Sequence, residues 1–295
     1  MGGQAVNVGV VDIGTNSMRL LITDGTIDLQ RLEQVTGLGR GVDSTGLLSE
    51  PRIVETVAVL ERYGKLMSEA GVARRKVIAT SASRDAANRE AFFDRAEAAI
   101  GIRPTLISGE DEARLAYEGA LSGFQGASPV VVSDIGGGST EFVTEESGVS
   151  IDIGSVRVTE RAVPFHPARP EEVEAARDEV REAFSGLSAF EYGSLIGVAG
   201  TWTSLASVAR AAPVGSSVHG REVTRAEVAK IIEILAELDL DETARLPGLD
   251  PKRAEVILGG ILVAEGVMDA LGAETATVSQ HDTMDGVAKS LLALP

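Results

Sequence analysis

The chain has 295 residues, of which 44% are hydrophobic and none is cysteine, and its formal net charge is −17. Disulfides and thiolate metal sites are therefore excluded, and the acidic balance argues against general binding of nucleic acid polymers or anionic membranes, because both depend on basic surfaces. The N-terminal sequence has no basic leader, and no stretch approaches the roughly 18 apolar residues of a membrane helix, so we expect a cytoplasmic protein.

The first half of the chain predicts strands that alternate with helices. Hydrophobic spacing and turn residues place strands at 6–13, 19–23, 76–80 and 104–107 and helices at 51–71, 85–99 and 110–121. Such alternation is typical of an α/β sheet, and the first two strands form a hairpin. Because residues 122–126 have the composition of a connection, we predict two lobes, 1–124 and 125–295.

The second half begins in the same way and is richer in helix. The expected strands are 129–134, 140–144, 195–199 and 275–278, and the expected helices are 170–187, 201–209, 224–238, 251–271 and 282–292. No low-complexity tract interrupts this pattern, so we expect no disordered interaction arm.

The two hairpins resemble each other in sequence. Residues 11–23 align with residues 133–145 at a single offset of 122, which matches Asp12 with Asp134, Gly14 with Gly136, and Ser17 with Ser139. Chance similarity between two ordinary hairpins is one explanation. The other is a duplicated domain, with two equivalent hairpins that face each other across a cleft.

Facing hairpins of this kind suit a metal-bound phosphate chain. Small residues at each turn let phosphate oxygens approach the backbone N–H groups closely. The predicted phosphate-binding turns are Gly14, Thr15, Asn16 and Ser17 in the first hairpin and Gly136, Gly137, Gly138 and Ser139 in the second. Asp12, Asp134 and Glu141 supply the oxygen ligands that Mg²⁺, Mn²⁺ or Ca²⁺ prefers. One such hairpin alone is more often a plain turn.

The sequence SGEDEAR at 108–114 places three carboxylates at a helix start. The helix dipole explains Glu110 and Asp111, with Ser108 as the cap. We interpret Glu112 as a general base that orients a water molecule for in-line attack on phosphorus.

Two arginines and a third glycine turn are further candidates. The guanidinium of Arg84 suits two-point binding of phosphoryl oxygens, although on spacing alone an exposed surface arginine is the commoner case. Arg157 has a similar possible role or is a solvated side chain. The turn and helix start at 197–206 suit a distal phosphate or a nucleotide. The histidines show no metal-ligand spacing and are expected to be ordinary polar residues: His166, His219 and His281.

Five motifs together resemble the exopolyphosphatase / guanosine pentaphosphate phosphohydrolase family. They are, in order, VVDIGTNSMRLLI, ATSASRDAANR, ISGEDEARLAYEG, DIGGGSTEFV and GSVRVTER. The likeness covers nearly the whole chain and is similar to the short, two-lobed form found in actinobacteria. It implies the α/β fold of the actin, Hsp70 and sugar-kinase superfamily, with two ribonuclease-H-like lobes and an active-site cleft between them.

The resemblance also implies roles for individual residues. Glu112 falls on the catalytic glutamate, and Arg84 on the phosphate-binding arginine. The metal-holding acids fall on Asp12, Asp134 and Glu141, which implies Mg²⁺ or Mn²⁺, and the two turns named above fall on the phosphate-binding loops. A homodimer is implied as well.

The chain departs from the family pattern in two places. Longer relatives carry additional C-terminal helical domains, which this sequence lacks, so we expect action on short rather than long chains. The segment SQHDTMDGV at 279–287 stands where many relatives have arginine, which affects contacts with distal phosphates or a nucleotide.

We therefore predict a metal-dependent exopolyphosphatase that releases orthophosphate from the end of inorganic polyphosphate. Removal of the 5′ γ-phosphate from guanosine pentaphosphate (pppGpp) is the alternative enzymatic activity. A sensor that binds polyphosphate or an alarmone without hydrolysis is the alternative of another class. Glu112 favours an enzyme, because an added carboxylate gives a pure polyanion binder no advantage.

Overall fold

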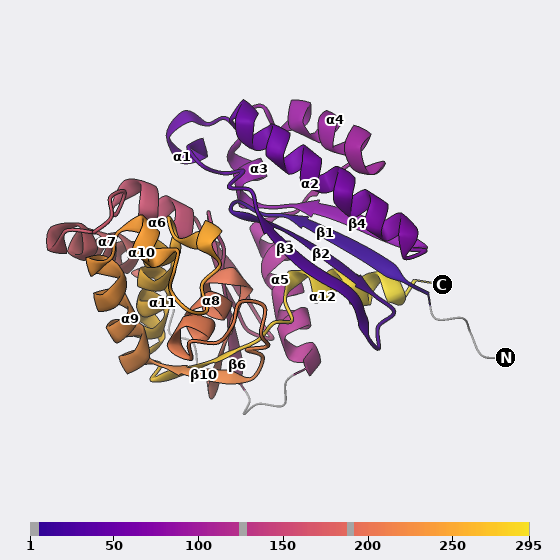
Figure 1. Cartoon of the computed structure of the whole chain (residues 1–295). Helices are drawn as coiled ribbons and strands as arrows, with labels where there is room; N and C mark the ends of the chain where they lie inside the picture. The colour runs from indigo at the N-terminus through magenta and orange to yellow at the C-terminus, as the bar shows by residue number, and fades with distance from the viewer. Residues whose placement is uncertain (1–5, 124–128, 188–191, 295) are drawn as a thin grey trace. The chain divides into compact units, whose positions relative to one another are not determined.

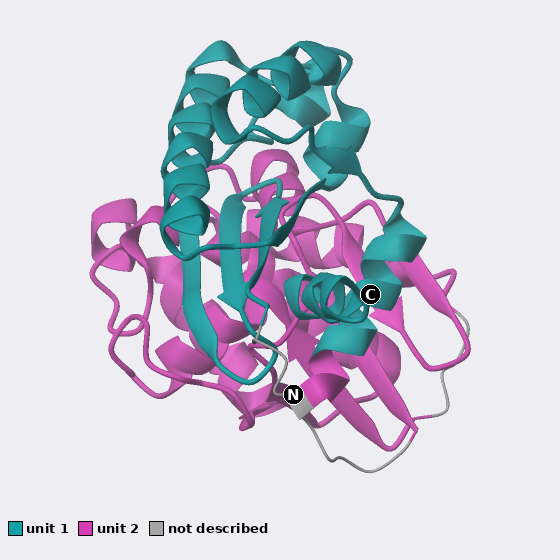
Figure 2. Ribbon diagram, turned by 90° about the vertical axis from the view of Figure 1, so that its right-hand side faces the viewer, with its two compact units in different colours: residues 1–119, 283–295 teal, residues 120–282 magenta. Residues whose placement is uncertain are grey.

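The computed structural model describes residues 6–123, 129–187 and 192–294, which form two compact units (Figures 1 and 2). Unit 1 comprises residues 1–119 and 283–295, and unit 2 comprises residues 120–282. The predicted lobe boundary between residues 124 and 125 lies outside the described residues.

Unit 1 contains a five-stranded mixed sheet in the order β3-β2-β1-β4-β5. Its strands are β1 (Val8–Ile13), β2 (Ser17–Thr23), β3 (Asp28–Val35), β4 (Arg74–Ala79) and β5 (Thr105–Leu106). β1, β2 and β3 are antiparallel neighbours, whereas β4 pairs parallel to β1 and to β5. The sequence did not predict β3, because most of its side chains are exposed or half-buried and give no apolar alternation.

Helices cover both faces of this sheet (Figure 1). They are α1 (Val42–Thr45), α2 (Glu50–Glu69), α3 (Ser81–Asp85), α4 (Arg89–Ile100), α5 (Gly109–Ala120) and α12 (Thr283–Leu292). Successive side chains of a strand point to opposite faces. Val11 and Ile13 accordingly pack in the cluster of α2 and α4, whereas Val8 and Val10 pack in the cluster of α5 and α12.

The final helix belongs to unit 1, which differs from the assignment of residues 125–295 to one lobe. Met284 and Val287 of α12 are buried in the same cluster as Val8 of β1. Arg31 of β3 also donates hydrogen bonds to both carboxylate oxygens of Asp285, at 3.1 and 2.6 Å. An apolar helix face must be buried, but only the packing shows which sheet buries it.

The helix predicted at 85–99 is interrupted. α3 ends at Asp85 and α4 begins at Arg89, and Asn88 lies between them. The Asn88 side chain accepts a hydrogen bond from Leu48 N at 2.9 Å and donates one to Leu48 O at 2.9 Å. In addition, Ala87 N donates to Gly46 O at 2.9 Å instead of to a carbonyl one turn back, so the backbone leaves the helical pattern between α3 and α4.

Unit 2 contains a six-stranded mixed sheet in the order β10-β11-β9-β6-β7-β8. Its strands are β6 (Val130–Ile135), β7 (Thr140–Val143), β8 (Gly148–Ile151), β9 (Ser194–Val198), β10 (Arg221–Thr224) and β11 (Thr275–Val278). β6, β9 and β11 run parallel, while β7 and β8 follow β6 as an antiparallel meander. Unit 1 has the same arrangement, a central strand with an antiparallel meander on one side and parallel strands on the other.

The described helices of unit 2 are η1 (Leu121–Gly123), α6 (Ser155–Arg161), α7 (Pro170–Phe184), α8 (Ala199–Ala209), α9 (Arg225–Glu237), α10 (Leu240–Thr243), η2 (Pro251–Arg253) and α11 (Ile257–Leu271). Of these, α6, α7, α8 and α9 pack against the apolar helix α11. Ten of the fifteen residues of α11 are buried. Glycines let other helices approach it: a Cβ at Gly259 would lie 2.4 Å from Thr159 Oγ1, and one at Gly266 would lie 2.2 Å from Val180 Cγ1. The segment predicted as one helix, 251–271, forms two helices in the structure, η2 and α11, which residues 254–256 separate.

The prediction of an α/β protein is confirmed, because each unit carries a mixed sheet flanked by helices.

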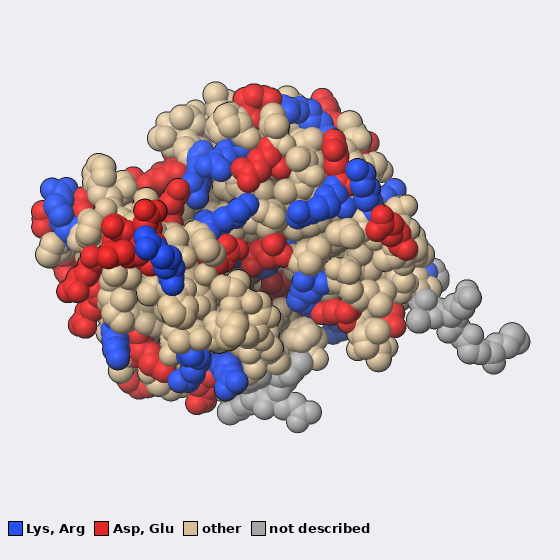
Figure 3. All heavy atoms as spheres, viewed as in Figure 1, with Lys and Arg blue, Asp and Glu red and all other residues tan. Residues whose placement is uncertain are grey.

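The surface is strongly acidic in places. Figure 3 shows Asp and Glu side chains gathered over the part of unit 2 that carries α7 and α10, at the left of the view. Among the described residues, no helix combines the length and apolar character needed to cross a membrane.

Candidate active site

The first hairpin turn of unit 1 places a buried aspartate beside an arginine. Asp12 lies opposite Arg19 in the register of β1 and β2 and is 3% exposed. Arg19 donates hydrogen bonds to Asp12 Oδ2 from two nitrogens, at 3.1 and 2.5 Å. Within the described part of the chain, Asp12 Oδ1 has no hydrogen-bond partner. Burial of such an oxygen is costly unless a ligand, a water or a cation satisfies it.

The turn itself is tight and is held from behind. Gly14 N donates to Ser17 O at 3.1 Å, and a Cβ on Gly14 would lie 2.8 Å from that oxygen. Thr15 Oγ1 accepts a hydrogen bond from Ala82 N of α3 at 3.2 Å. Asn16 O accepts from two amides of the loop after β3, at 3.0 and 2.8 Å. The backbone of the turn is therefore fixed without using the Asn16 side chain.

Several polar side chains around this turn are buried but lack partners among the described residues. They are the amide of Asn16 and the hydroxyls of Ser81 and Ser83, all at most 5% exposed. Ser81 and Ser83 lie on either side of Ala82, which contacts Thr15. Neither serine was predicted from the sequence, because hydroxyl residues after a strand resemble an ordinary turn or cap.

Arg84 and Glu112 form an ion pair in unit 1. Arg84 Nη1 donates to Glu112 Oε2 at 2.7 Å and to Ile107 O at 3.2 Å, and the two side chains are 20% and 13% exposed. Burial raises the pKa of the Glu112 carboxyl, an effect that Arg84 opposes and the charge of Asp12 reinforces. Asp12 and Glu112 interact because Asp12 shares the sheet face of Val8 and Val10, which α5 covers.

Ser108 caps the start of α5, as the sequence predicts, and Asp111 lies in its first turn. Ser108 Oγ accepts a hydrogen bond from Asp111 N at 3.0 Å. The Asp111 carboxylate accepts hydrogen bonds from Arg114 at 3.0 Å and from Ser108 Oγ at 2.9 Å, and these two bonds lower the pKa of Asp111. The Asp111 side chain is 53% exposed and pairs with residues at the start of its own helix, whereas Glu112 is 13% exposed and pairs with Arg84.

The second hairpin places two buried carboxylates directly opposite each other. Asp134 of β6 pairs in register with Glu141 of β7, and they are 4% and 1% exposed. Glu141 in turn lies opposite Ser150 of β8, whose hydroxyl donates to Glu141 Oε1 at 2.6 Å. Like charges at opposed positions repel, so the pair is suited to a cation. Within the described residues, no group of three or more acidic or histidine side chains could hold a metal by itself.

The two hairpins correspond residue by residue. Gly136 N donates to Ser139 O at 3.0 Å, as Gly14 N does to Ser17 O, and the offset of 122 that relates these residues also relates Arg19 to Glu141. The cross-strand partner of the aspartate is therefore a cation in unit 1 and an acid in unit 2. This difference assigns the stronger cation-binding character to the second hairpin.

The turn of the second hairpin has its carbonyl groups bound to the start of α6. Ser155 N donates to Gly136 O at 3.0 Å, Val156 N to Gly137 O at 2.8 Å, and Arg157 Nε to Gly138 O at 2.6 Å. The C=O and N–H groups of one trans peptide point in opposite directions. The N–H groups of Gly137, Gly138 and Ser139 consequently point away from α6, as an anion-binding turn requires. Arg157 contacts the turn itself.

A buried arginine that the sequence did not predict lies at the start of α8. Arg253 of η2 is 7% exposed, and a Cβ on Gly200 would lie 2.1–2.5 Å from its guanidinium atoms. The preceding residue, Ala199, has a positive φ of 67°. The guanidinium therefore lies against the first turn of α8, which follows β9. Its sequence context, DPKR, is indistinguishable from an exposed turn.

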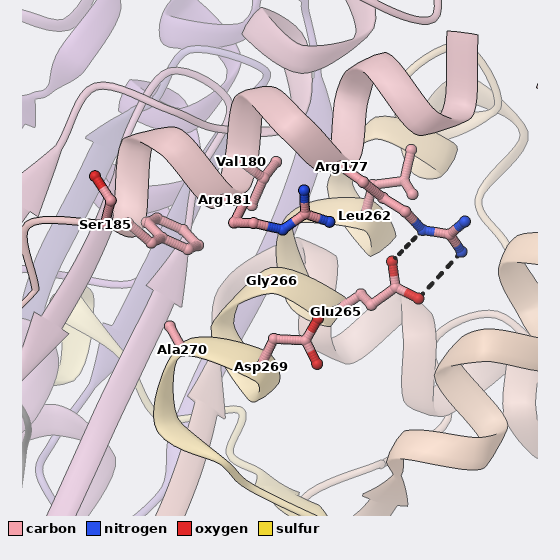
Figure 4. A pocket seen from close by; sticks show the side chains of 10 residues that line it. Arg177, Val180, Arg181, Ser185, Leu262, Glu265, Gly266, Asp269 and Ala270 are labelled. Atoms are coloured by element: carbon pink, nitrogen blue, oxygen red, sulfur yellow. Dashed lines mark hydrogen bonds and ion pairs between the residues drawn. The ribbon is translucent and has the colours of Figure 1, made fainter. Parts of the chain in front are cut away.

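Unit 2 also has a pocket of about 390 Å³ between α7 and α11 that none of the predicted site residues lines (Figure 4). Arg177 donates to both carboxylate oxygens of Glu265 at its edge, at 2.8 and 3.2 Å. Its lining is mixed: apolar residues (Val180, Phe184, Leu262, Gly266 and Ala270) alternate with the polar residues Arg181, Ser185 and Asp269.

Comparisons with known proteins agree with this description. The profile of the Ppx/GppA phosphatase family matches residues 20–294. The chain is 37% identical to exopolyphosphatase 2 of Mycobacterium tuberculosis, with 96% of this chain and 98% of that protein covered. It is 32% identical to a bifunctional 3-dehydroquinate synthase/phosphatase of Fusobacterium nucleatum, with 94% of this chain but 45% of that protein covered.

Solved structures of proteins similar to this chain have a similar fold. An exopolyphosphatase-like protein superposes with a TM-score of 0.91 at 29% identity, covering 96% of this chain and 98% of that one. The Ppx/GppA family member of Aquifex aeolicus superposes with a TM-score of 0.79 at 31% identity, covering 97% and 98%. These likenesses confirm the predicted two-lobed α/β fold.

Proposed function

Because the chain belongs to the Ppx/GppA phosphatase family, we propose that it is an exopolyphosphatase that hydrolyses the terminal phosphoanhydride of short inorganic polyphosphate. The name of its relative from Mycobacterium tuberculosis supports this substrate. The observation that carries the proposal is the buried Glu112 carboxylate, paired with Arg84 and close enough to Asp12 for their charges to interact.

Glu112 acts as the general base in this proposal. A water oxygen attacks the terminal phosphorus while its proton passes to Glu112, and the bond from that phosphorus to the bridging oxygen breaks. The products are orthophosphate and a chain shortened by one phosphate. A carboxylate with a raised pKa is a stronger base near neutral pH than an exposed one, and the bond from Arg84 fixes its orientation.

The turn amides and Arg84 bind the phosphate oxygens. Transferred phosphoryl groups spread negative charge over their oxygens, so positioning and electrostatic stabilisation supply most of the catalysis. The N–H groups of Gly137, Gly138 and Ser139, together with those of Thr15, Asn16 and Ser17, are our proposed donors. Gly14 N and Gly136 N instead close their turns by donating to Ser17 O and Ser139 O. Arg157 holds the second turn from the side of its carbonyl groups.

The buried acids fit a divalent cation, and we propose Mg²⁺ or Mn²⁺. Asp134 and Glu141 are opposed carboxylates, and Asp12 Oδ1 is a buried oxygen without a partner in the described chain. Mg²⁺ typically takes one or two carboxylates and completes its shell with water and substrate phosphates. When bound, the ion would offset negative charge on the phosphate chain.

The proposal is tested by phosphate release from short polyphosphate with Mg²⁺ or Mn²⁺, comparing wild type with Glu112→Gln. Loss of a general base should lower kcat by about 10²- to 10⁴-fold. Glu118→Gln is the matched control, because Glu118 lies on the same helix and pairs with Arg114 at 3.6 Å; its turnover should stay within about twofold, as for other surface changes. Retained turnover in Glu112→Gln would show that the assigned base is wrong.

The same panel separates the alternatives. Removal of the γ-phosphate from pppGpp needs the same residues, and a higher kcat/KM for pppGpp than for polyphosphate would favour that substrate. If wild type binds both compounds and hydrolyses neither, the sensor function is correct instead. We also propose a homodimer, as the family resemblance implies, to be checked by light scattering of the purified protein.

A further inference from the structure

One glutamine joins two loops of unit 2 at the start of β10 and the end of β11. Gln280 Oε1 accepts hydrogen bonds from Ser217 Oγ at 2.9 Å, from Val218 N at 3.2 Å and from His219 N at 3.2 Å. Three donors on one oxygen fix the loop before β10 against the loop after β11. The two histidines carried by these loops are therefore held in place before any ligand binds.

The same contact determines which nitrogen of His219 carries the proton. Gln280 N donates to His219 Nδ1 at 3.3 Å, and a backbone N–H can only donate. Nδ1 is thus an acceptor, and the neutral ring has its proton on Nε2. No described residue accepts a hydrogen bond from this Nε2, and the side chain is half-buried, so the N–H group is available to a ligand.

His281 completes a pair of rings. The centroids of His219 and His281 lie 5.0 Å apart with an interplanar angle of 86°. Ser279 Oγ fixes the His281 backbone, accepting from its N–H at 3.1 Å and donating to its C=O at 3.1 Å. The edge-to-face contact and this local turn keep both imidazoles together.

The pair lies on the edge of the sheet that carries the second hairpin turn. β6, β9 and β11 are parallel neighbours, so their carboxyl ends share one edge. Ser279 N donates to Gly197 O at 2.8 Å, and Gly220 N donates to Val278 O at 2.8 Å, which places both loops at that edge. Two strand spacings amount to about 10 Å between the ends of β6 and β11. Ligands of parallel sheets bind at this edge.

We propose that His219 and His281 bind the phosphates of the substrate that lie farthest from the cleaved bond. This inference rests on the proposed function. It assigns a specificity role to two histidines that the sequence predicted to be ordinary polar residues, one of which, His281, lies in the segment 279–287 that departs from the family pattern. The order along the edge is the hairpin turn at the end of β6, then the start of α8, then the histidine pair. A neutral imidazole N–H suits a phosphate oxygen as a donor. A chain too short to pass the start of α8 does not reach the pair.

The test compares tripolyphosphate with a longer, defined polyphosphate, using His219→Phe and His281→Phe. Phenylalanine keeps an aromatic ring and removes the N–H donors. We expect KM for the longer chain to rise about tenfold, the effect of losing one hydrogen bond to a charged group, with kcat unchanged. KM for tripolyphosphate should stay at the wild-type value. His166→Phe is the matched control, because His166 lies in the loop before α7, and both KM values should remain unchanged.

Two outcomes would overturn the inference: unchanged KM for both substrates in both variants, or an equal rise for both. If the wild type hydrolyses neither compound, the proposed function fails, and calorimetric binding of the longer polyphosphate then decides the inference separately. Equal affinity of wild type and His219→Phe would refute it, and weaker binding by the variant would support it. Thermal unfolding of each variant shows whether the loops remain folded.

Discussion

The opposed carboxylates of the second hairpin make a quantitative prediction about Glu141→Gln. Asp134 and Glu141 are directly opposed and are at least 96% buried. Charges about 5 Å apart at an effective dielectric constant of about 20 repel by about 3 kcal/mol. Glutamine removes this repulsion and still offers Oε1 to the Ser150 hydroxyl, which now donates to Glu141 at 2.6 Å.

We therefore expect Glu141→Gln to be more stable than wild type when divalent metal is removed. For a domain of this size, each kcal/mol of added stability raises Tm by about 2–4 °C. Because the wild type relieves part of the repulsion, we expect Tm to rise by about 5 °C. The rise in Tm that Mg²⁺ produces should be smaller in the variant, because one ligand oxygen loses its charge. Differential scanning calorimetry in chelator and in Mg²⁺ measures both effects.

Ser150→Ala is the control, because it removes the hydrogen bond to Glu141 without changing the charge. It should lower Tm slightly, by the effect of about 1 kcal/mol for one hydrogen bond, and it should keep most of the Mg²⁺ response. The reasoning would be refuted if Glu141→Gln melted below wild type in chelator and showed the full Mg²⁺ shift.

Three further predictions concern unit 1. Burial raises the pKa of Glu112 above its ordinary value of 4.5, and the ionised carboxylate is the active form. A pH–rate profile should therefore show kcat/KM falling as the pH drops through this raised pKa. Gly39→Ala should destabilise the protein by about 2–3 kcal/mol, because the added Cβ would lie 2.3 Å from Thr15 Cγ2 in the hairpin turn. Gly186→Ala is the control and should not destabilise it, because among the described residues, apart from its chain neighbours, no atom lies within 4 Å of the added Cβ. Urea unfolding measures the free energy of unfolding of both variants. Burial raises the pKa of Tyr63 to about 12, so about 2–3 kcal/mol of stability should be present below pH 10 and be lost as the pH rises toward 12. Tyr63→Phe should abolish that loss. The prediction would be contradicted if the free energy of unfolding fell equally steeply with pH, between about pH 10 and 12, in wild type and variant.

The sequence by itself determined the elements that carry the proposed chemistry. The apolar run ending in Asp12 and Gly14, repeated at Asp134 and Gly136, predicted both hairpins, and the structure has β1–β2 and β6–β7 at these positions. The α/β class followed from the same periodicity. Local signals suffice here because alternation and turn residues act over a few neighbouring positions. The predicted meeting of the two hairpins in one cleft stays a prediction.

Tertiary structure decided what periodicity does not encode. The hydrogen bond of Arg84 to Glu112 joins residues 28 positions apart, and the exchange between Asn88 and Leu48 that interrupts a predicted helix joins residues 40 positions apart. Neither pairing leaves a signal in its own segment. The same holds for α12, whose apolar face fits any hydrophobic surface, and only the contacts with Val8 show that it closes unit 1. Burial depends on which segments pack together, and burial is what raises the pKa of Glu112.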